Sequence, residues 1–275
     1  MRASAIAYWA PKEGSSDAEY EDAWQVLPAT SDEVPGDWVG VAVADGATES
    51  LLAGQWATMM AGGFAEASAA ACDRHLFAET ALALSARWPG VVDSYIAERE
   101  NAARPLRWFE RPGIAKGAFA TLLALQVYTD STLPVRLGAQ TQPGPPSVLG
   151  SWHSAAIGDT CLFHVRGGQL QVAFPLGESA DFGTRPALLG SWDADEDVIV
   201  AHVRLADGAV AEGDDFFVCT DALAAWFLAR AEEGGRPWET LRDVTDIGFA
   251  EWVSWARRAG GLRNDDVTLV HVDIW

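Results

Sequence analysis

Runs of apolar residues separated by turn-forming residues predict a chain that alternates between groups of strands and two helical blocks. Strands are expected at 3–9, 23–27, 38–44, 117–127, 152–157, 161–166, 170–174, 198–205, 216–220 and 267–274. An alanine-rich segment predicts two long helices over 49–104, divided near Trp88-Pro89-Gly90 because proline and glycine together interrupt a helix. A loop is expected over 105–115, and a second helical block, in several pieces, over 222–258.

The order of these elements predicts the fold class. The strands come in long groups and do not alternate strictly with helices, which favours an antiparallel sandwich with helices outside it over a doubly wound parallel sheet. The segment 129–150, rich in proline and glycine, is interpreted as a surface connection rather than a linker. We therefore expect one domain over residues 1–275.

Net charge and cysteine spacing limit the partners, the cellular location and the cysteine chemistry that we expect. The net charge of −20 disfavours nucleic acid or an anionic membrane as a partner, because the Coulomb interaction would be repulsive. No apolar run is long enough for a membrane span, and the N-terminus lacks the pattern of a signal peptide, so a cytoplasmic location is expected. Cys72, Cys161 and Cys219 are widely spaced and form no Cys-x-x-Cys pair, so we expect small buried hydrophobes rather than a disulfide or zinc site.

Several other polar and aromatic positions are interpreted as structural. The acidic run 193–197 predicts a solvated loop. Histidines within predicted strands are expected to be structural: His164, His202 and His271. Aromatic residues at roughly helical spacing in the second helical block are expected in the core: Trp226, Phe227, Trp238, Trp252 and Trp255.

Acidic residues recur where apolar strands begin or end. The positions that share this setting are Glu21-Asp22, Asp45, Asp221 and Asp265-Asp266. A carboxylate at the rim of an apolar sheet is costly to desolvate, and a hard divalent cation such as Mg²⁺ or Mn²⁺ would compensate that cost. Each residue alone is also explained as an acidic turn or a helix cap, as Asp221 would be for a helix starting at Ala222. Spacing does not choose between these interpretations.

Six short motifs occur in the same order along the chain as in a known protein family. They are Glu21-Asp22, Asp45-Gly46, Gly117-Ala118-Phe119-Ala120-Thr121, Gly158-Asp159-Thr160, Cys219-Thr220-Asp221-Ala222 and Asn264-Asp265-Asp266-Val267-Thr268. In this order, over nearly the whole chain, they resemble the metal-dependent protein phosphatases of type 2C, and most closely the shorter bacterial branch. The resemblance implies an α+β fold, a four-layer α/β/β/α sandwich of two antiparallel sheets flanked by helices.

The resemblance also implies a centre of two Mn²⁺ or Mg²⁺ ions. Asp45 would bridge both ions and the Gly46 carbonyl would bind one of them. Asp221 and Asp265 would hold the other ion. Two close cations lower the pKa of a bridging water and neutralise phosphoryl oxygens. Catalysis would then need no covalent enzyme nucleophile.

Three further residues take roles around this centre by resemblance. Asp22, with Glu21 as its neighbour, would bind or orient metal-bound water, and Asp159 would help to hold a third, weaker metal. The acidic residues expected to act in catalysis are Asp22, Asp45, Asp221 and Asp265.

The sequence departs from the family pattern in three places. The arginine that contacts substrate phosphate shortly before the Glu-Asp pair has no counterpart in residues 15–20. Lys12 is the candidate substitute for substrate binding, as a point charge rather than a bidentate fork, with a solvated surface lysine as the alternative. Ala222 stands where relatives have glycine, and Asp266 where they have asparagine.

The predicted function is hydrolysis of phosphoserine or phosphothreonine in proteins by a metal-dependent phosphatase. Its expected partners are a phosphorylated protein substrate and a cognate Ser/Thr kinase. The missing arginine keeps a second hypothesis open, a degenerate family member that acts as a binding or regulatory module. A third is an acidic cation-binding protein without phosphatase activity.

Overall fold

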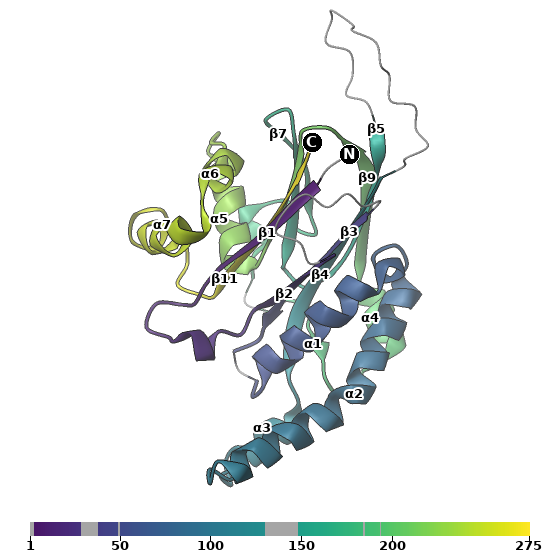
Figure 1. Ribbon diagram of the computed structural model, residues 1–275, viewed down its shortest axis with the longest axis vertical. Helices are drawn as coiled ribbons and strands as arrows, with labels where there is room; N and C mark the ends of the chain where they lie inside the picture. The colour runs from purple at the N-terminus through teal and green to yellow at the C-terminus, as the bar shows by residue number, and fades with distance from the viewer. Residues whose placement is uncertain (1–2, 29–37, 49, 130–147, 184, 193) are drawn as a thin grey trace, which may run out of the picture.

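The computed structural model describes residues 3–28, 38–48, 50–129, 148–183, 185–192 and 194–275. Two antiparallel sheets lie face to face at its centre (Figure 1). The first sheet has the order β1 (Ala3–Ala10), β11 (Val267–Ile274), β10 (Asp214–Cys219), β6 (Cys161–Arg166) and β7 (Gln169–Phe174). The second has the order β2 (Ala23–Leu27), β3 (Trp38–Gly46), β4 (Phe119–Thr129), β5 (Val148–Ile157) and β9 (Arg204–Ala211), and the short β8 (Leu189–Gly190) also pairs with β4.

Helices cover the outer face of each sheet (Figure 1). The second sheet is covered by α1 (Ala53–Glu66) and α2 (Arg74–Asn101), with α4 (Glu196–His202) beside α2. The first sheet is covered by α5 (Asp221–Glu232), α6 (Pro237–Asp243) and α7 (Asp246–Ala259). A short helix, α3 (Arg111–Lys116), follows α2, and 3₁₀ turns lie at Asp17–Glu19, Ser68–Ala71 and Ser179–Asp181. The expected four-layer α/β/β/α sandwich is therefore confirmed.

The sequence of β3 explains how the layers are held together. Val41 and Val43 point into the core between the two sheets, whereas Ala42 and Ala44 face α1. All four are completely buried, so this strand is apolar on both faces. The small alanine side chains leave room for Trp56 of α1, which is also fully buried. This two-sided burial fixes the end of β3, where Asp45 lies.

The strand predicted at 198–205 is wrong. Residues 196–202 form α4, and the strand β9 begins only at Arg204. The Asp195 carboxylate caps the helix by accepting a hydrogen bond from the Val198 backbone N–H at 3.1 Å. The acidic run predicted as a loop therefore supplies a helix cap and first turn, where carboxylates are favoured by the helix dipole. His202 accordingly ends a helix and does not lie in a strand.

The predicted division of the first helical block near Pro89 is also wrong. The helix α2 continues through Pro89, and the break lies before Asp73, whose carboxylate caps α2. Trp88 and Val92 flank the proline and are both buried, and this packing stabilises the helix across it. The loop predicted over 105–115 contains the start of α3, in which proline occupies the first turn without loss of a helical hydrogen bond.

Two predictions about side-chain burial need correction. Cys161 and Cys219 are buried as expected, but Cys72 is exposed. Trp255 is 53% exposed on α7, although Trp226 on α5 is buried. Within the part of the chain that the structure describes, no helix is long and apolar enough to cross a lipid bilayer.

Candidate metal centre

Strand ends bring the predicted carboxylates to one end of the sandwich. Asp45 lies next to the last residue of β3, opposite Thr121 of β4. The Thr121 hydroxyl lies 2.7 Å from the hydroxyl of Thr160, which follows Asp159. Asp221, the first residue of α5, is separated from the end of β10 only by Thr220. A pocket of about 580 Å³ opens here, and its lining includes Asp45, Asp159, Asp221 and Asp265. Gly46 lines it as well, so five of the predicted site residues share one cavity.

Asp22 is not among the described residues that line this pocket; with Glu21 it lines a second pocket of about 270 Å³, and threonines hold its carboxylate. Its carboxylate accepts a hydrogen bond from the Thr268 hydroxyl at 2.8 Å. The Thr268 backbone N–H in turn donates to the Thr220 hydroxyl at 2.9 Å, and the Tyr20 hydroxyl also contacts the Thr268 hydroxyl. Thr220 directly precedes Asp221, so this network ties Asp22 to the opposite sheet. Both threonines lie within the sequence motifs, which by themselves indicate no role for them.

The glycines of the motifs allow close approach of the backbone. A Cβ atom at Gly46 would lie 2.6 Å from the Glu21 carbonyl oxygen and 3.0 Å from Ala53. Gly158 adopts φ +97°, and a Cβ there would lie 2.4 Å from the Thr121 side chain. These contacts explain why Asp45 and Asp159 each neighbour a glycine.

Burial and mutual repulsion shift the ionisation of these carboxyls. Burial raises the pKa of Asp45 well above its usual value, and repulsion from the carboxylates of Asp22, Asp221, Asp159 and Asp265 raises it further. Burial is also the main cause that raises the pKa of Asp22 to about 8 and that of Asp159 to about 6. Full ionisation of these carboxyls would therefore place more negative charge in the site than its protein surroundings neutralise.

Burial raises the pKa of Asp221 as well, although the nearby Arg263 opposes the shift. The Arg263 guanidinium donates to the Asp221 carboxylate at 3.0 Å. Lys116 and Arg185 line the same pocket. Sequence reasoning missed these three cations. Arg263 directly precedes the Asn264-Asp265 motif and Arg185 lies outside the six motifs, and neither position carries a signal of its own.

Asp266 and Lys12 lie at the edge of the site. The Asp266 carboxylate accepts hydrogen bonds from the backbone N–H groups of Lys12 at 2.8 Å and Glu21 at 2.9 Å. The Lys12 ammonium lies 3.8 Å from the Glu21 carboxylate. Lys12 is not among the described residues that line the 580 Å³ pocket. Its predicted role in substrate binding stays a prediction.

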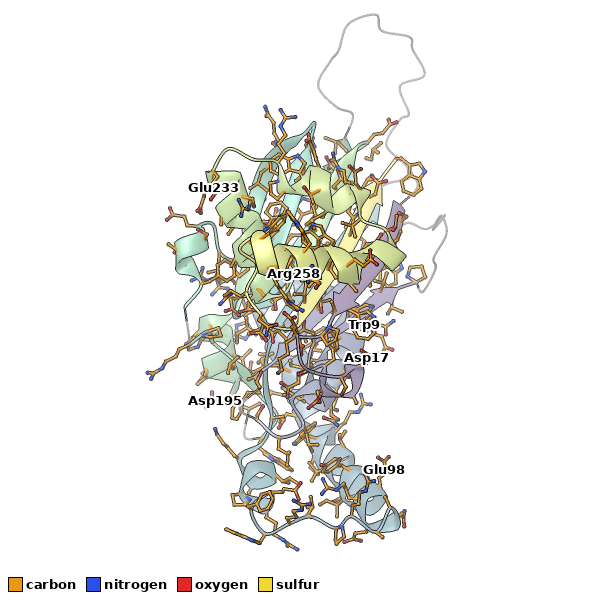
Figure 2. The ribbon with its side chains drawn as sticks, turned by 90° about the vertical axis from the view of Figure 1, so that its left-hand side faces the viewer. Trp9, Asp17, Glu98, Asp195, Glu233 and Arg258 are labelled. Carbon is orange, nitrogen blue, oxygen red and sulfur yellow. The ribbon has the colours of Figure 1, made fainter. Side chains whose placement is uncertain are left out.

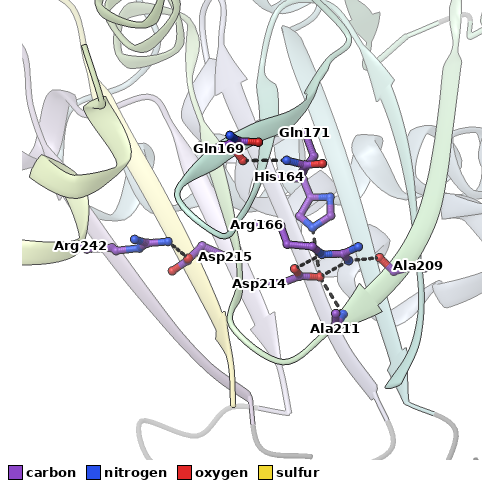
Figure 3. Close-up of polar contacts among 9 residues, drawn as sticks. All are labelled: His164, Arg166, Gln169, Gln171, Ala209, Ala211, Asp214, Asp215 and Arg242. Carbon is purple, nitrogen blue, oxygen red and sulfur yellow. Dashed lines mark hydrogen bonds and ion pairs between the residues drawn. The ribbon is translucent and has the colours of Figure 1, made fainter. Parts of the chain in front are cut away.

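Two of the histidines, His164 on β6 and His271 on β11, lie beside carboxylates at the start of β10. His164 lies 3.1 Å from the carboxylate of Asp214, and His271 lies 2.8 Å from that of Asp215. Arg166 also pairs with Asp214 (Figure 3). Asp214 begins β10, whereas Asp221 follows its end. These histidines are therefore structural partners of buried carboxylates, remote from the candidate metal centre.

The chemistry of the donors fits a hard divalent cation. Carboxylate oxygens and a backbone carbonyl are the ligands that Mg²⁺ and Mn²⁺ prefer. Positive charge would relieve the repulsion that raises the pKa of Asp45. Among the described residues, no three His, Cys, Asp or Glu side chains lie close enough together to hold a metal ion as they stand. Cation binding would require these side chains to close around the ion.

Comparisons with known proteins support the fold. No protein-family model matches the chain, and no curated protein matches it. The catalytic domain of the serine/threonine phosphatase PstP, solved with two manganese ions, aligns with a TM-score of 0.53 and 15% identity over 99% of this chain and 98% of that one. PppA, a key regulatory component of T6SS in Pseudomonas aeruginosa, aligns with a TM-score of 0.52 and 16% identity over 100% of this chain and 99% of that one. A chain from the bacterial stressosome, a modular system adapted to control secondary messenger signalling, aligns with a TM-score of 0.51 and 18% identity over 99% of this chain and 100% of that one.

The structural neighbours of this chain include serine/threonine phosphatases of type 2C. The resemblance found in the sequence motifs is thus confirmed at the level of the fold. At these identities the likeness establishes the architecture alone, and the chemistry has to be argued from the residues of the site.

Proposed function

We propose that this chain is a Mn²⁺- or Mg²⁺-dependent phosphatase that hydrolyses phosphoserine or phosphothreonine esters in proteins. The observation that carries the proposal is the gathering of acidic residues from separate strands at one end of the sandwich. Repulsion from four other carboxylates raises the pKa of Asp45 there, on top of burial. Strongly perturbed carboxyls in a pocket are typical of functional sites.

The residues that would hold the ions are those of the sequence motifs. Asp45 and the Gly46 carbonyl, with Asp221 and Asp265, would bind two ions. Glu21 and Asp22 would orient water, and Asp159 would hold a third ion. Bound divalent cations supply positive charge that neutralises phosphoryl oxygens and acidifies water.

The chain's own cations would position the substrate. Lys116 and Arg185 line the same pocket as the carboxylates and would draw a phosphate group toward them. Lys12 remains a second candidate for this contact, at the edge of the site. Burial raises the pKa of the Cys161 and Cys219 thiols, so neither supplies a thiolate nucleophile. The partners of such an enzyme are a phosphorylated protein and the kinase that modifies it.

Hydrolysis of a small aryl phosphate with and without Mn²⁺ tests the proposal. We expect Asp45→Asn and Asp221→Asn to lower kcat by about a hundredfold or more, since each removes negative charge that holds a cation. Arg185→Ala should raise KM and leave Mn²⁺ binding unchanged, and Lys12→Ala should do the same if that lysine contacts phosphate. Equal background rates in wild type and both Asp variants would overturn the enzyme proposal.

A binding module is the second candidate. It is favoured by the absent arginine and by Arg263, which already occupies the Asp221 carboxylate at 3.0 Å. Calorimetric titration with Mn²⁺ separates the two. Saturable binding in wild type that is lost in Asp45→Asn, together with no hydrolysis by wild type, would favour the binding module.

A further inference from the structure

The connection between α2 and α3 exposes two neighbouring aromatic residues. Trp108 is 82% exposed and Phe109 is 54% exposed, with their ring centroids 5.9 Å apart in an edge-to-face arrangement. This connection lies at the lower end of the molecule, beyond the body of the two sheets, and Glu98 marks the nearby end of α2 (Figures 1 and 2). Adjacent exposed aromatics of this size add nothing to a core, and they are typical of binding surfaces. We call residues 99–111 the α2–α3 tip.

The tip is held in one conformation by a charged clamp. The Arg99 guanidinium donates to both carboxylate oxygens of Glu110, at 3.1 and 3.2 Å. Its Nε donates to the Arg104 carbonyl at 2.8 Å, and Glu110 also accepts from the Arg107 backbone N–H at 2.7 Å. Ala103 adopts φ +54°, which a non-glycine residue keeps only when its surroundings fix it. A preorganised surface loses less conformational entropy on binding.

The tip is basic in an acidic protein. Residues 99–111 contain four of the chain's 19 lysines and arginines but only two acidic residues, whereas the whole chain has a net charge of −20. Arg104, Arg107 and Arg111 are exposed, and none forms an ion pair with a carboxylate that the structure describes. The Arg107 guanidinium instead lies over the Phe109 ring, 5.8 Å from its centroid. Arginine and aromatic side chains side by side suit a partner that is acidic and partly apolar.

The tip leads directly to the candidate metal centre. From Arg111, α3 runs to Lys116, which lines the 580 Å³ pocket. The helix is fixed to the body of the protein by Trp192, whose indole N–H donates to the Ile114 carbonyl at 3.0 Å. A polypeptide bound at the tip would therefore continue toward the pocket across a basic helix.

We propose that the α2–α3 tip docks an acidic segment of the protein substrate, with an apolar side chain of that segment against Trp108 and Phe109. The inference rests on the proposed function in naming the partner a substrate. An anionic lipid surface has the same local chemistry but meets the repulsion of the whole chain. A second copy of the chain meets that repulsion as well. A short acidic segment carries little charge of its own and meets mainly the local positive field of the tip.

Binding is tested without turnover, on wild-type protein in EDTA. The probe is a pool of short fluorescein-labelled peptides rich in Asp and Glu with one Leu or Phe, and fluorescence anisotropy reports binding. A pool with Lys in place of Asp and Glu is the matched probe. We expect binding of the acidic pool only, and weakening as NaCl is raised. Trp108→Ala and Arg107→Glu should each weaken it about tenfold or more.

Control variants carry the same changes on α7, far from the tip in Figure 2, where Arg258 is labelled. Trp255→Ala removes a tryptophan that is 53% exposed, and Arg258→Glu reverses an exposed arginine. Both should bind like wild type. No binding of the acidic pool, or equal loss in tip and control variants, would overturn the proposal.

Two further measurements exclude the other occupants. If phosphatidylserine vesicles bind the wild-type protein but not the Trp108→Ala variant, and no peptide binds, the tip is assigned to a membrane. If sedimentation shows a dimer that Arg107→Glu dissociates, and again no peptide binds, the tip is assigned to a second copy of the chain. Either result would overturn peptide docking. Because the assay is metal-free, an inactive enzyme that still binds the pool would defeat the proposed function and leave the docking surface standing.

Discussion

Replacement of Asp22 by asparagine tests the electrostatic account of the candidate centre. Asparagine keeps the size of the side chain and can still accept the Thr268 hydrogen bond, but it does not ionise. Burial raises the pKa of Asp22 from 3.8 to about 8 in the folded protein. In the unfolded chain the group has its ordinary value of about 4. Between these values the folded protein holds a proton that the unfolded chain has released.

The sign and size of the effect follow from this difference. The contribution of protonated Asp22 to the free energy of unfolding is fully present below about pH 4 and is lost as the pH rises through about 8. Each pH unit in this window lowers the free energy of unfolding by about 1.4 kcal/mol for one proton. The full window is therefore worth about 5 kcal/mol as an upper bound, because solvent relaxation reduces it. In Asp22→Asn the free energy of unfolding should fall less steeply with pH, by about 1.4 kcal/mol per pH unit, and near pH 8 the variant should be more stable than wild type.

Urea unfolding followed by circular dichroism, in EDTA at several pH values between 5 and 8, measures this slope. Asp93→Asn, at an exposed carboxylate on α2, is the matched control and should run parallel to wild type. Parallel curves for wild type and Asp22→Asn would refute the reasoning, because they would show that Asp22 ionises alike in the folded and unfolded states.

Three other predictions concern the same molecule. Mn²⁺ binding at pH 7 should release protons, since carboxyls such as Asp22 must ionise to bind it; calorimetry in buffers of different ionisation enthalpy detects this, and heats that do not depend on the buffer would contradict it. Arg166→Met should lower the free energy of unfolding by about 3–5 kcal/mol, because Asp214 is completely buried and would lose its charged partner. Urea unfolding should show much of that loss restored when Asp214→Asn is added. Gly46→Ala should lower both the melting temperature and the Mn²⁺ affinity, since its Cβ would lie 2.6 Å from the Glu21 carbonyl oxygen; an unchanged titration would separate that contact from the centre.

Strands with clear turn signals could be predicted from the sequence, and those decided by distant contacts could not. The strands at 161–166 and 267–274 have the predicted bounds, because apolar runs there end at turn residues. The run Val198-Ile199-Val200 is β-branched and favours a strand locally, yet the Asp195 cap and packing beside α2 make it helical. Pro89 predicts a break that buried neighbours override. In both cases tertiary packing outweighed local propensity.

The same limit applies to the site. The motifs located the carboxylates, because an acidic residue beside glycine at a strand end is a local pattern. The hydrogen bond between Thr268 and Asp22 joins residues 246 positions apart, and no local pattern predicts it. Arg185 and Lys116 line the pocket only because the fold brings their segments together. The ordered motifs thus name carboxylates that share the pocket, whereas the basic residues that line it are found only in the folded structure.

The burial of these carboxylates also bears on which hypothesis for the chain is favoured. A merely acidic cation-binding protein would place its carboxylates at the surface, where water stabilises their charge. Here Asp22 is 6% exposed and burial raises its pKa to about 8, so folding encloses a carboxyl whose charged form is unfavourable there. Such a cost persists when the site has a use for it. Cation binding alone would account for the carboxylates, but it gives no reason for Arg185 and Lys116 to line the same pocket. A substrate that carries negative charge, such as a phosphate ester, gives those cations a partner, and the phosphatase proposal therefore explains both sets of charges.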